Sequence, residues 1–222
     1  MDSLSLENRR LFVAGATGAT GRTLLPLASE LGVDLIPHLR PASAERLGAD
    51  APDRSATLEL SDRTSLQAVL ADRTTVVQLI GTMKKRFSQG DTYESSDIGT
   101  TRSHVAAAEG TAVDHIVLLS SVGAGRPTGA YLKAKAAAEQ LVTESGIDWT
   151  IFRPSAFIGA GHGLPWGVPG LMRTLAPQRY HPIAIEDLAR ALLYVACSRS
   201  HLGEVLEGRT LWEAVYESRQ DS

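Results

Sequence analysis

A glycine-rich turn near the N-terminus constrains this chain more than any other feature. The short apolar run 11–14 ends at Gly15, and Gly18 and Gly21 follow at three-residue spacing just as a helical pattern begins. In such a turn one glycine lets the backbone bend tightly, another lets it approach a ligand, and a third lets helix and strand pack closely. This order of strand, turn and helix predicts a site for the pyrophosphate of a dinucleotide.

Short apolar runs alternate with helical patterns along most of the chain, as they do in parallel α/β sheets. Strands are expected at 11–14, 33–39, 56–60, 75–80, 115–119 and 149–152, with short closing strands at 205–206 and 210–212. Helices are expected at 19–31, around 66–70, over roughly 91–109, and at 130–144 and 185–196. We therefore predict an α/β fold with a doubly wound parallel sheet, the Rossmann fold, and a small C-terminal substrate-binding portion.

We expect residues 1–222 to form a single dinucleotide-binding domain, because this length suits one hydrophobic core. The segment 154–182 differs in texture from the rest, since prolines and glycines recur through it. A long irregular segment inside a compact domain is usually functional, so 154–182 is the expected substrate loop or lid.

The composition argues against several classes of protein. A net charge of -3 disfavours nucleic-acid binding through a basic surface. The single cysteine, Cys197, forms no internal disulfide and fits a reducing compartment. The chain shows no long apolar stretch and no apolar signal core, and its histidines lack metal-ligand spacing. We expect a cytoplasmic protein without metal, membrane or nucleic acid, whose partner is a small-molecule substrate; its oligomeric state stays open.

The residues after the second expected strand bear on the choice of nucleotide. An acidic residue there would bind the ribose 2′-hydroxyl of NAD(H) and repel a 2′-phosphate. This chain instead has Arg40, and Arg22 follows the glycine turn. A guanidinium can bind a phosphate with two parallel hydrogen bonds, so NADP(H) is favoured over NAD(H). The alternative is that Arg40 is a solvated loop charge.

Tyr131 and Lys135 are the main catalytic candidates. They are four residues apart on an expected helix and therefore share one face. An ammonium beside a phenol favours the ionised phenol, so a tyrosine placed in this way can exchange a proton with a carbonyl or alcohol oxygen. The alternative is a packing tyrosine beside a solvated lysine.

Ser120 or Ser121, at the end of the fifth expected strand, is positioned to hold the same oxygen by a hydrogen bond. Neighbouring residues of a strand face opposite sides, so strand register decides between them. We choose Ser121.

These motifs together resemble the short-chain dehydrogenase/reductase superfamily, in its atypical, NmrA-like or NAD(P)H-binding branch. The residues that carry the resemblance are 15–21, 38–41, 118–124, 131–135, Glu139, 148–154 and 185–189. The resemblance implies that Ser121, Tyr131 and Lys135 form the catalytic set and that Lys135 binds the nicotinamide ribose. It also implies that the backbone at Gly81 and Thr82 passes close to the ribose.

The expected cofactor-binding residues come from the glycine turn, from the carboxyl ends of the strands and from the helix face of Tyr131 and Lys135. They are Gly15, Thr17, Gly18, Ala19, Thr20, Gly21, Arg22, Arg40, Leu60, Gly81, Thr82, Ser120, Tyr131, Lys135, Pro154, Ser155 and Phe157. The resemblance implies that those after the sixth strand border the nicotinamide.

Three functional hypotheses follow. The leading one is an NADP(H)-dependent reductase or dehydrogenase of the short-chain type that acts on a small carbonyl or alcohol. The second is an NADP(H)-binding regulator that senses redox state without turnover. The third is an epimerase or isomerase that retains its cofactor, and the short C-terminal portion and Arg40 argue against it.

Overall fold

The computed structural model describes residues 9–81, 92–159 and 176–220 of the chain. In this part, seven parallel strands form one sheet in the order β3-β2-β1-β4-β5-β6-β9. The strands are β1 (Arg10–Ala14), β2 (Asp34–Leu39), β3 (Ala56–Thr57), β4 (Thr75–Gln78), β5 (His115–Leu119), β6 (Asp148–Phe152) and β9 (Glu204–Leu206). The predicted doubly wound Rossmann sheet is thus confirmed.

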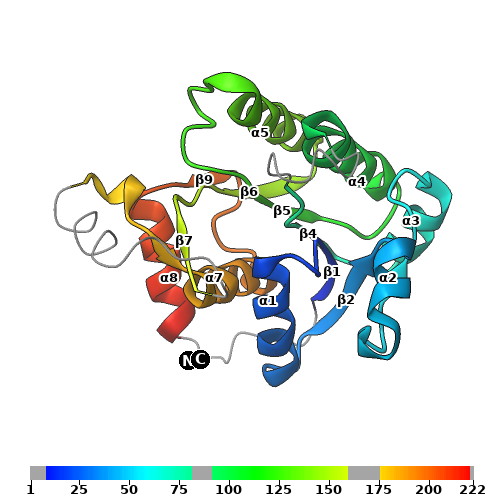
Figure 1. Ribbon diagram of the computed structural model, residues 1–222. Helices are drawn as coiled ribbons and strands as arrows, with labels where there is room; N and C mark the ends of the chain where they lie inside the picture. The colour runs from blue at the N-terminus through cyan, green and yellow to red at the C-terminus, as the bar shows by residue number, and fades with distance from the viewer. Residues whose placement is uncertain (1–8, 82–91, 160–175, 221–222) are drawn as a thin grey trace.

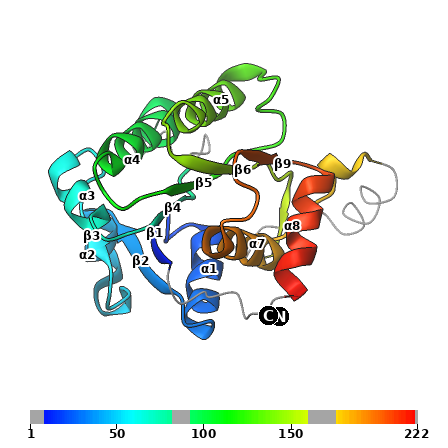
Figure 2. The ribbon, with the colours of Figure 1, turned by 180° about the vertical axis from the view of Figure 1, so that it is seen from behind.

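Helices cover both faces of this sheet (Figure 1). The helices are α1 (Ala19–Glu30), α2 (Pro41–Leu47), α3 (Arg63–Leu70), α4 (Thr100–Ala108), α5 (Gly129–Thr143), α7 (Ile185–Ser198) and α8 (Arg209–Gln220). Shorter helical turns are η2 (Gly48–Asp50), η4 (Glu94–Gly99) and η5 (Gln178–Tyr180). Seen from behind in Figure 2, α3, α4 and α5 again lie on one side of the strands, and α1, α7 and α8 lie on the other.

Alternation along β1 explains why both faces are covered. Leu11 and Val13 are fully buried in a core with α1, α7 and α8. Phe12 and Ala14 point the other way and are fully buried against α3, α4 and α5. A strand that is apolar on both faces requires helices on both sides, as in doubly wound folds.

Two predicted strands need correction. The third is shorter than the expected 56–60, because the chain turns at Glu59, whose carbonyl oxygen accepts from Asp62 N at 2.9 Å. The expected strand 210–212 is wrong, since these residues lie in α8. Burial of Leu211, Ala214 and Val215 shows a helical period that a three-residue window could not reveal.

The expected substrate segment 154–182 is described in part. Near its start, β7 (Phe157–Ile158) pairs in a second, two-stranded parallel sheet with β8 (Ile183–Ala184), which follows directly after the segment. Residues 160–175, the middle of the segment, lie outside the described residues.

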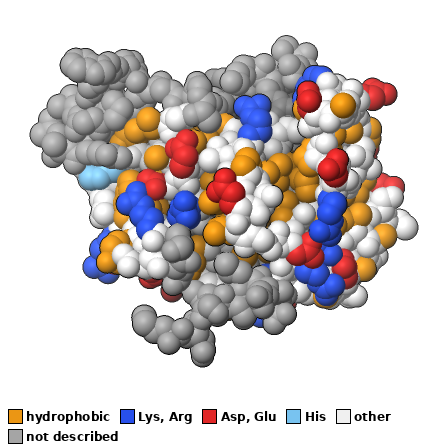
Figure 3. All heavy atoms as spheres, turned by 90° about the horizontal axis from the view of Figure 1, so that it is seen from below, with side chains coloured by type: hydrophobic (Ala, Val, Ile, Leu, Met, Phe, Trp, Pro, Cys, Tyr) orange, Lys and Arg blue, Asp and Glu red, His pale blue; other side chains and the backbone are white. Residues whose placement is uncertain are grey.

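None of the helices in the described ranges has the length and apolar character that a membrane crossing needs. The described residues also contain no group of three or more His, Cys, Asp or Glu side chains that could hold a metal ion. On the face seen in Figure 3, acidic and basic side chains lie interspersed.

Candidate functional site

The glycine turn joins β1 to α1 with very little space to spare. Gly15 has φ +94°, and a Cβ there would lie 2.9 Å from the backbone of Leu79. A Cβ on Gly21 would lie 2.5 Å from the carbonyl oxygen of Gly15. Gly18 is the N-cap of α1 and supplies no capping side chain. The first N–H groups of α1 therefore receive no capping hydrogen bond from a side chain at the N-cap, and such groups can bind a phosphate.

Two cavities open on either side of this turn. The first, which we call the Arg40 cavity, has a volume of about 470 Å³. Its lining is mostly polar side chains and glycines from the ends of β1, β2, β3 and β4 and from η4 and α4. The lining residues are Gly15, Thr17, Gly18, His38, Arg40, Ser43, Glu59, Leu60, Ser61, Leu79, Ile80, Gly81, Ser95, Ser96, Gly99, Thr100 and Ser103.

The second, which we call the Tyr131 cavity, has a volume of about 640 Å³. Its lining residues are Gly15, Gly18, Ala19, Thr20, Gly21, Leu79, Gly81, Tyr93, Leu119, Ser120, Ser121, Tyr131, Lys135, Pro154, Ser155, Ala156 and Phe157. The two cavities share Gly15, Gly18, Leu79 and Gly81, so they meet over the glycine turn. This shape suits a ligand with two halves joined by an anionic group.

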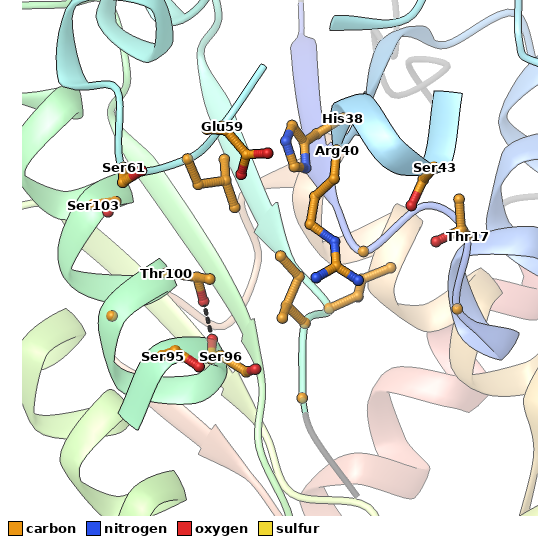
Figure 4. Close-up of a pocket in the computed structure, with 17 residues that line it drawn as sticks. Thr17, His38, Arg40, Ser43, Glu59, Ser61, Ser95, Ser96, Thr100 and Ser103 are labelled. Carbon is orange, nitrogen blue, oxygen red and sulfur yellow. Dashed lines mark hydrogen bonds between the residues drawn. The ribbon is translucent and has the colours of Figure 1, made fainter. Parts of the chain in front are cut away.

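The guanidinium of Arg40 extends into its cavity, between Thr17 and Ser43 on one side and Ser96 and Thr100 on the other (Figure 4). Arg40 is the N-cap of α2, and Pro41 follows at the first helical position. The α2 helix thus begins at the rim of the cavity, with Ser43 buried in its first turn. The sequence placed Arg40 correctly after β2 but did not indicate α2 or Ser43.

His38 and Glu59 add ionisable groups to the Arg40 cavity. The buried His38 ring has its Nε2 atom 2.9 Å from the carbonyl oxygen of Leu58. Burial lowers the pKa of His38, and Arg40 lowers it further, although the Leu58 carbonyl and Glu59 oppose the shift. Neutral His38 therefore leaves Arg40 as the strongest positive charge among the residues that line this cavity.

Lys135 lies at the base of the Tyr131 cavity. Its side chain is 6% exposed, and its Nζ atom lies 2.9 Å from Oδ1 of the buried Asp97. Nζ also donates a hydrogen bond to the carbonyl oxygen of Leu119 at 3.1 Å. Tyr131 is 37% exposed, one helical turn before Lys135, with its ring centroid 5.8 Å from that of Tyr93. The Tyr131 side chain is therefore accessible from the cavity, whereas Asp97 and the Leu119 carbonyl group hold the Lys135 ammonium.

The two serines after β5 differ in their partners. The buried Ser120 hydroxyl donates to Glu139, whose carboxylate also pairs with Arg153. The Ser121 hydroxyl lies 3.5 Å from the carbonyl oxygen of Val122, a long contact, and it lines the Tyr131 cavity. Strand register therefore leaves Ser121 the more available of the two to a ligand.

Most of the expected site residues come together around the two cavities. The exceptions are Arg22 and Thr82. Arg22 is exposed and lines neither cavity, because the first turn of α1 carries it past the rim, so its expected place beside the cofactor is not supported. Thr82 lies outside the described residues.

The sequence did not indicate several residues that line or support the site. Tyr93 and Asp97 reach it through η4, a π-helical turn inside the expected long helix. Glu59 and Ser61 reach it because β3 ends early. The one available signal was a polar face on the expected helix 91–109, where Ser96, Thr100 and Ser103 recur.

A family model described as NAD(P)H-binding matches residues 15–196 of the chain. These residues include the glycine turn, Arg40, Tyr131 and Lys135. No curated protein sequence matches the chain.

Several solved structures share the fold. MoeE5, solved with UDP-glucose and NAD, is 19% identical with a TM-score of 0.68 over 95% of this chain and 81% of that one. A nucleoside-diphosphate-sugar epimerase from Staphylococcus aureus is 18% identical, with a TM-score of 0.64 over 95% and 77%. ChuY, an anaerobillin reductase from Escherichia coli O157:H7, is 17% identical, with a TM-score of 0.60 over 84% and 90%. Identities this low show a common fold.

Proposed function

This chain belongs to the NAD(P)H-binding family, the branch of atypical short-chain dehydrogenases/reductases that its sequence motifs resemble, and we propose that it is an NADP(H)-dependent oxidoreductase acting on a small carbonyl or alcohol. The observation that carries the proposal is the junction of two cavities over one glycine turn. One cavity contains an arginine suited to phosphate, and the other contains a tyrosine and a lysine on one helix face.

The residues present fit a dinucleotide. A pyrophosphate would meet the start of α1 between Gly15 and Gly18, where backbone N–H groups and the helix dipole favour an anion. The adenosine half would lie in the Arg40 cavity, and the nicotinamide half would lie in the Tyr131 cavity, bordered by Pro154, Ser155 and Phe157.

Arg40 supports the preference for NADP(H). Its guanidinium extends into the cavity close to Ser43 and Thr17, whose hydroxyls can donate to the same phosphate. An acidic side chain would disfavour a 2′-phosphate, and Glu59 is the acidic residue lining this cavity. Figure 4 shows Glu59 on the His38 side of the cavity, whereas Ser43 and Thr17 lie on the opposite side.

Tyr131 would give its phenolic proton to a carbonyl oxygen, or accept one from an alcohol, at the open side of its cavity. The bound nicotinamide supplies or accepts the hydride. Lys135 would hold the ribose hydroxyls and stabilise negative charge on the phenol oxygen. Ser121 would donate a hydrogen bond to the substrate oxygen and hold it beside Tyr131.

The test combines binding with turnover. Titration of the protein with NADPH and with NADH should give the tighter binding for NADPH. Consumption of NADPH, followed at its nicotinamide absorbance across a panel of carbonyls and quinones, should then identify at least one substrate. Tight NADPH binding without turnover across the panel would instead favour a regulator that senses the redox state of the cofactor.

Cys197 bears on the cellular compartment of the protein. The buried thiol of Cys197, whose pKa burial raises to about 12, is unreactive and compatible with a reducing compartment. We place the protein in the cytoplasm, with a small molecule and not a nucleic acid or a membrane as its partner.

A further inference from the structure

We propose that Asp97 is a positioning residue, which holds the Lys135 ammonium where the nicotinamide ribose would meet it. The inference rests on the proposed function, because it concerns the role of Lys135 toward the cofactor. Asp97 lines neither cavity, whereas its ion-pair partner Lys135 lines the Tyr131 cavity, so Asp97 would influence the cofactor through Lys135.

The contacts of the ammonium carry this inference. A lysine has three N–H donors. The ammonium forms an ion pair with Asp97 Oδ1 at 2.9 Å and donates one hydrogen bond, to the Leu119 carbonyl oxygen at 3.1 Å. Its other donors can serve a ligand in the Tyr131 cavity, which Lys135 lines. An ion pair and a hydrogen bond to two different elements determine the position of Nζ far better than one contact could.

The burial of the pair shows that its geometry is specific. The Asp97 side chain has no exposed surface, and that of Lys135 is 6% exposed. A buried charge without a partner is strongly destabilising, so the two charges hold each other in place. A solvated ion pair, by contrast, would let the long lysine chain adopt many positions.

An unusual helical turn brings Asp97 to this place. Residues Glu94–Gly99 form a π-helical turn (η4) that continues into α4. The hydroxyl of Thr101 donates to the Asp97 carbonyl oxygen at 2.7 Å and supports the widened turn. A Cβ on Gly99 would lie 3.0 Å from the Glu94 carbonyl oxygen, so a larger residue would crowd the turn at this position. Such turns occur frequently at functional sites.

Gly81 completes the arrangement from the sheet side. A Cβ at this position would lie 2.8 Å from Lys135 Nζ and 3.4 Å from Asp97 Oδ1. Gly81 also lines both cavities. The absence of a side chain at Gly81, just after β4, therefore leaves room for the Lys135 ammonium. This room lies where the two cavities meet and where the two halves of a dinucleotide would join.

The experiment compares two ligands on the full chain by calorimetric titration. NADPH reaches Lys135, whereas adenosine 2′,5′-bisphosphate contains only the half that fits the Arg40 cavity. Asp97→Asn keeps the shape of the side chain and removes its charge. We expect Asp97→Asn to weaken NADPH binding about tenfold, because the Lys135 ammonium loses the ion pair that holds it. We expect binding of the bisphosphate to be unchanged.

A double-mutant cycle tests whether Asp97 acts through Lys135. Lys135→Met should weaken NADPH binding, and Asp97→Asn combined with Lys135→Met should weaken it no further. The matched control is Lys133→Met, which removes an exposed lysine from the same helix and should leave both affinities unchanged.

Three outcomes would overturn the inference: equal weakening of both ligands by Asp97→Asn, unchanged NADPH binding in that variant, or additive effects in the cycle. If Asp97→Asn does not fold, the double variant, which has no uncompensated charge, replaces it, and an NADPH affinity below that of Lys135→Met overturns the inference. Failure of the proposed function looks different, because the native chain would then bind NADPH no more tightly than the bisphosphate, or would not bind it, and both proposals would fall.

Discussion

Arg153 donates to both carboxylate oxygens of Glu139, from Nε at 2.9 Å and from Nη2 at 2.5 Å. The same carboxylate accepts a hydrogen bond from Ser120, and Arg153 also pairs with Glu207. The hydrogen bond to Glu139 raises the pKa of Arg153, against the opposing effect of burial. This network ties the ends of β5, β6 and β9 to α5, and it separates the roles of the two serines that follow β5.

Ser120→Ala should therefore lower stability, whereas Ser121→Ala should lower turnover. Loss of the Ser120 hydroxyl removes one partner of the buried Glu139, so the free energy of unfolding should fall by about 1 kcal/mol. Loss of the Ser121 hydroxyl should leave stability unchanged and reduce kcat by about 100-fold, because a donor to the substrate oxygen is removed. Denaturant unfolding and steady-state kinetics measure the two effects. The opposite pattern would assign the catalytic role to Ser120.

Arg40→Ala should weaken NADPH binding by about 10- to 100-fold, because charged hydrogen bonds to the 2′-phosphate are lost. NADH lacks this phosphate, so its affinity should not change. Fluorescence titration with both cofactors measures the difference. Arg22→Ala is the matched control, since Arg22 is exposed and lines neither cavity. An equal loss of affinity for NADPH and for NADH would show that Arg40 does not bind the 2′-phosphate.

Gly21→Ala should destabilise the fold by about 1–3 kcal/mol, the usual cost of overpacking a tight site. The added Cβ would lie 2.5 Å from the Gly15 carbonyl oxygen and 2.6 Å from Ala16 Cα, and both are backbone atoms that cannot rotate away. Thermal unfolding measures the loss. A melting temperature equal to that of the native chain would show that β1 and α1 are not packed as closely as described.

The buried His104 should make the protein sensitive to acid. Burial lowers the pKa of His104 from 6.5 to about 3. At a pH between these two values the unfolded chain binds a proton at His104, whereas the folded chain does not. The contribution of neutral His104 to the free energy of unfolding is therefore fully present above pH 6.5 and is lost as the pH falls toward 3. His104→Leu should therefore lose about 2 kcal/mol less unfolding free energy than the native chain between about pH 7 and pH 5.

His201 provides a control of opposite sign. Burial opposes its protonation, but the carboxylates of Glu204 and Glu217 outweigh burial and raise the pKa of His201. Its contribution is present at low pH and is lost as the pH rises through the raised pKa. His201→Gln should thus leave the acid limb of the stability profile unchanged. An acid limb that is the same in His104→Leu and in the native chain would contradict the assignment to His104.

The sequence could predict those parts of the site that depend on local order. The glycine turn follows β1 directly, and Arg40 follows β2, so their positions depend on the ends of two strands that apolar runs reveal. Tyr131 and Lys135 share a face because the period of an ordinary helix is known.

The sequence could not predict the role of Asp97, because that role does not depend on local order. An ion pair joins Asp97 to Lys135 on a different helix, α5, and no helical period reveals a contact between two helices. Glu59 reaches the Arg40 cavity because β3 ends early, which no periodicity over 56–60 reveals. Likewise, the choice between Ser120 and Ser121 depends on Glu139, a partner 19 residues away from Ser120.

The measurement that tests the central claim most directly is NADPH consumption by Tyr131→Phe with a carbonyl substrate identified for the native chain. The claim predicts that kcat falls by 100-fold or more, because the proton donor is lost, while NADPH affinity stays the same. Tyr216→Phe, a change at a 64% exposed tyrosine on α8, should retain full activity. Undiminished turnover by Tyr131→Phe would contradict the claim that Tyr131 exchanges the proton in this site.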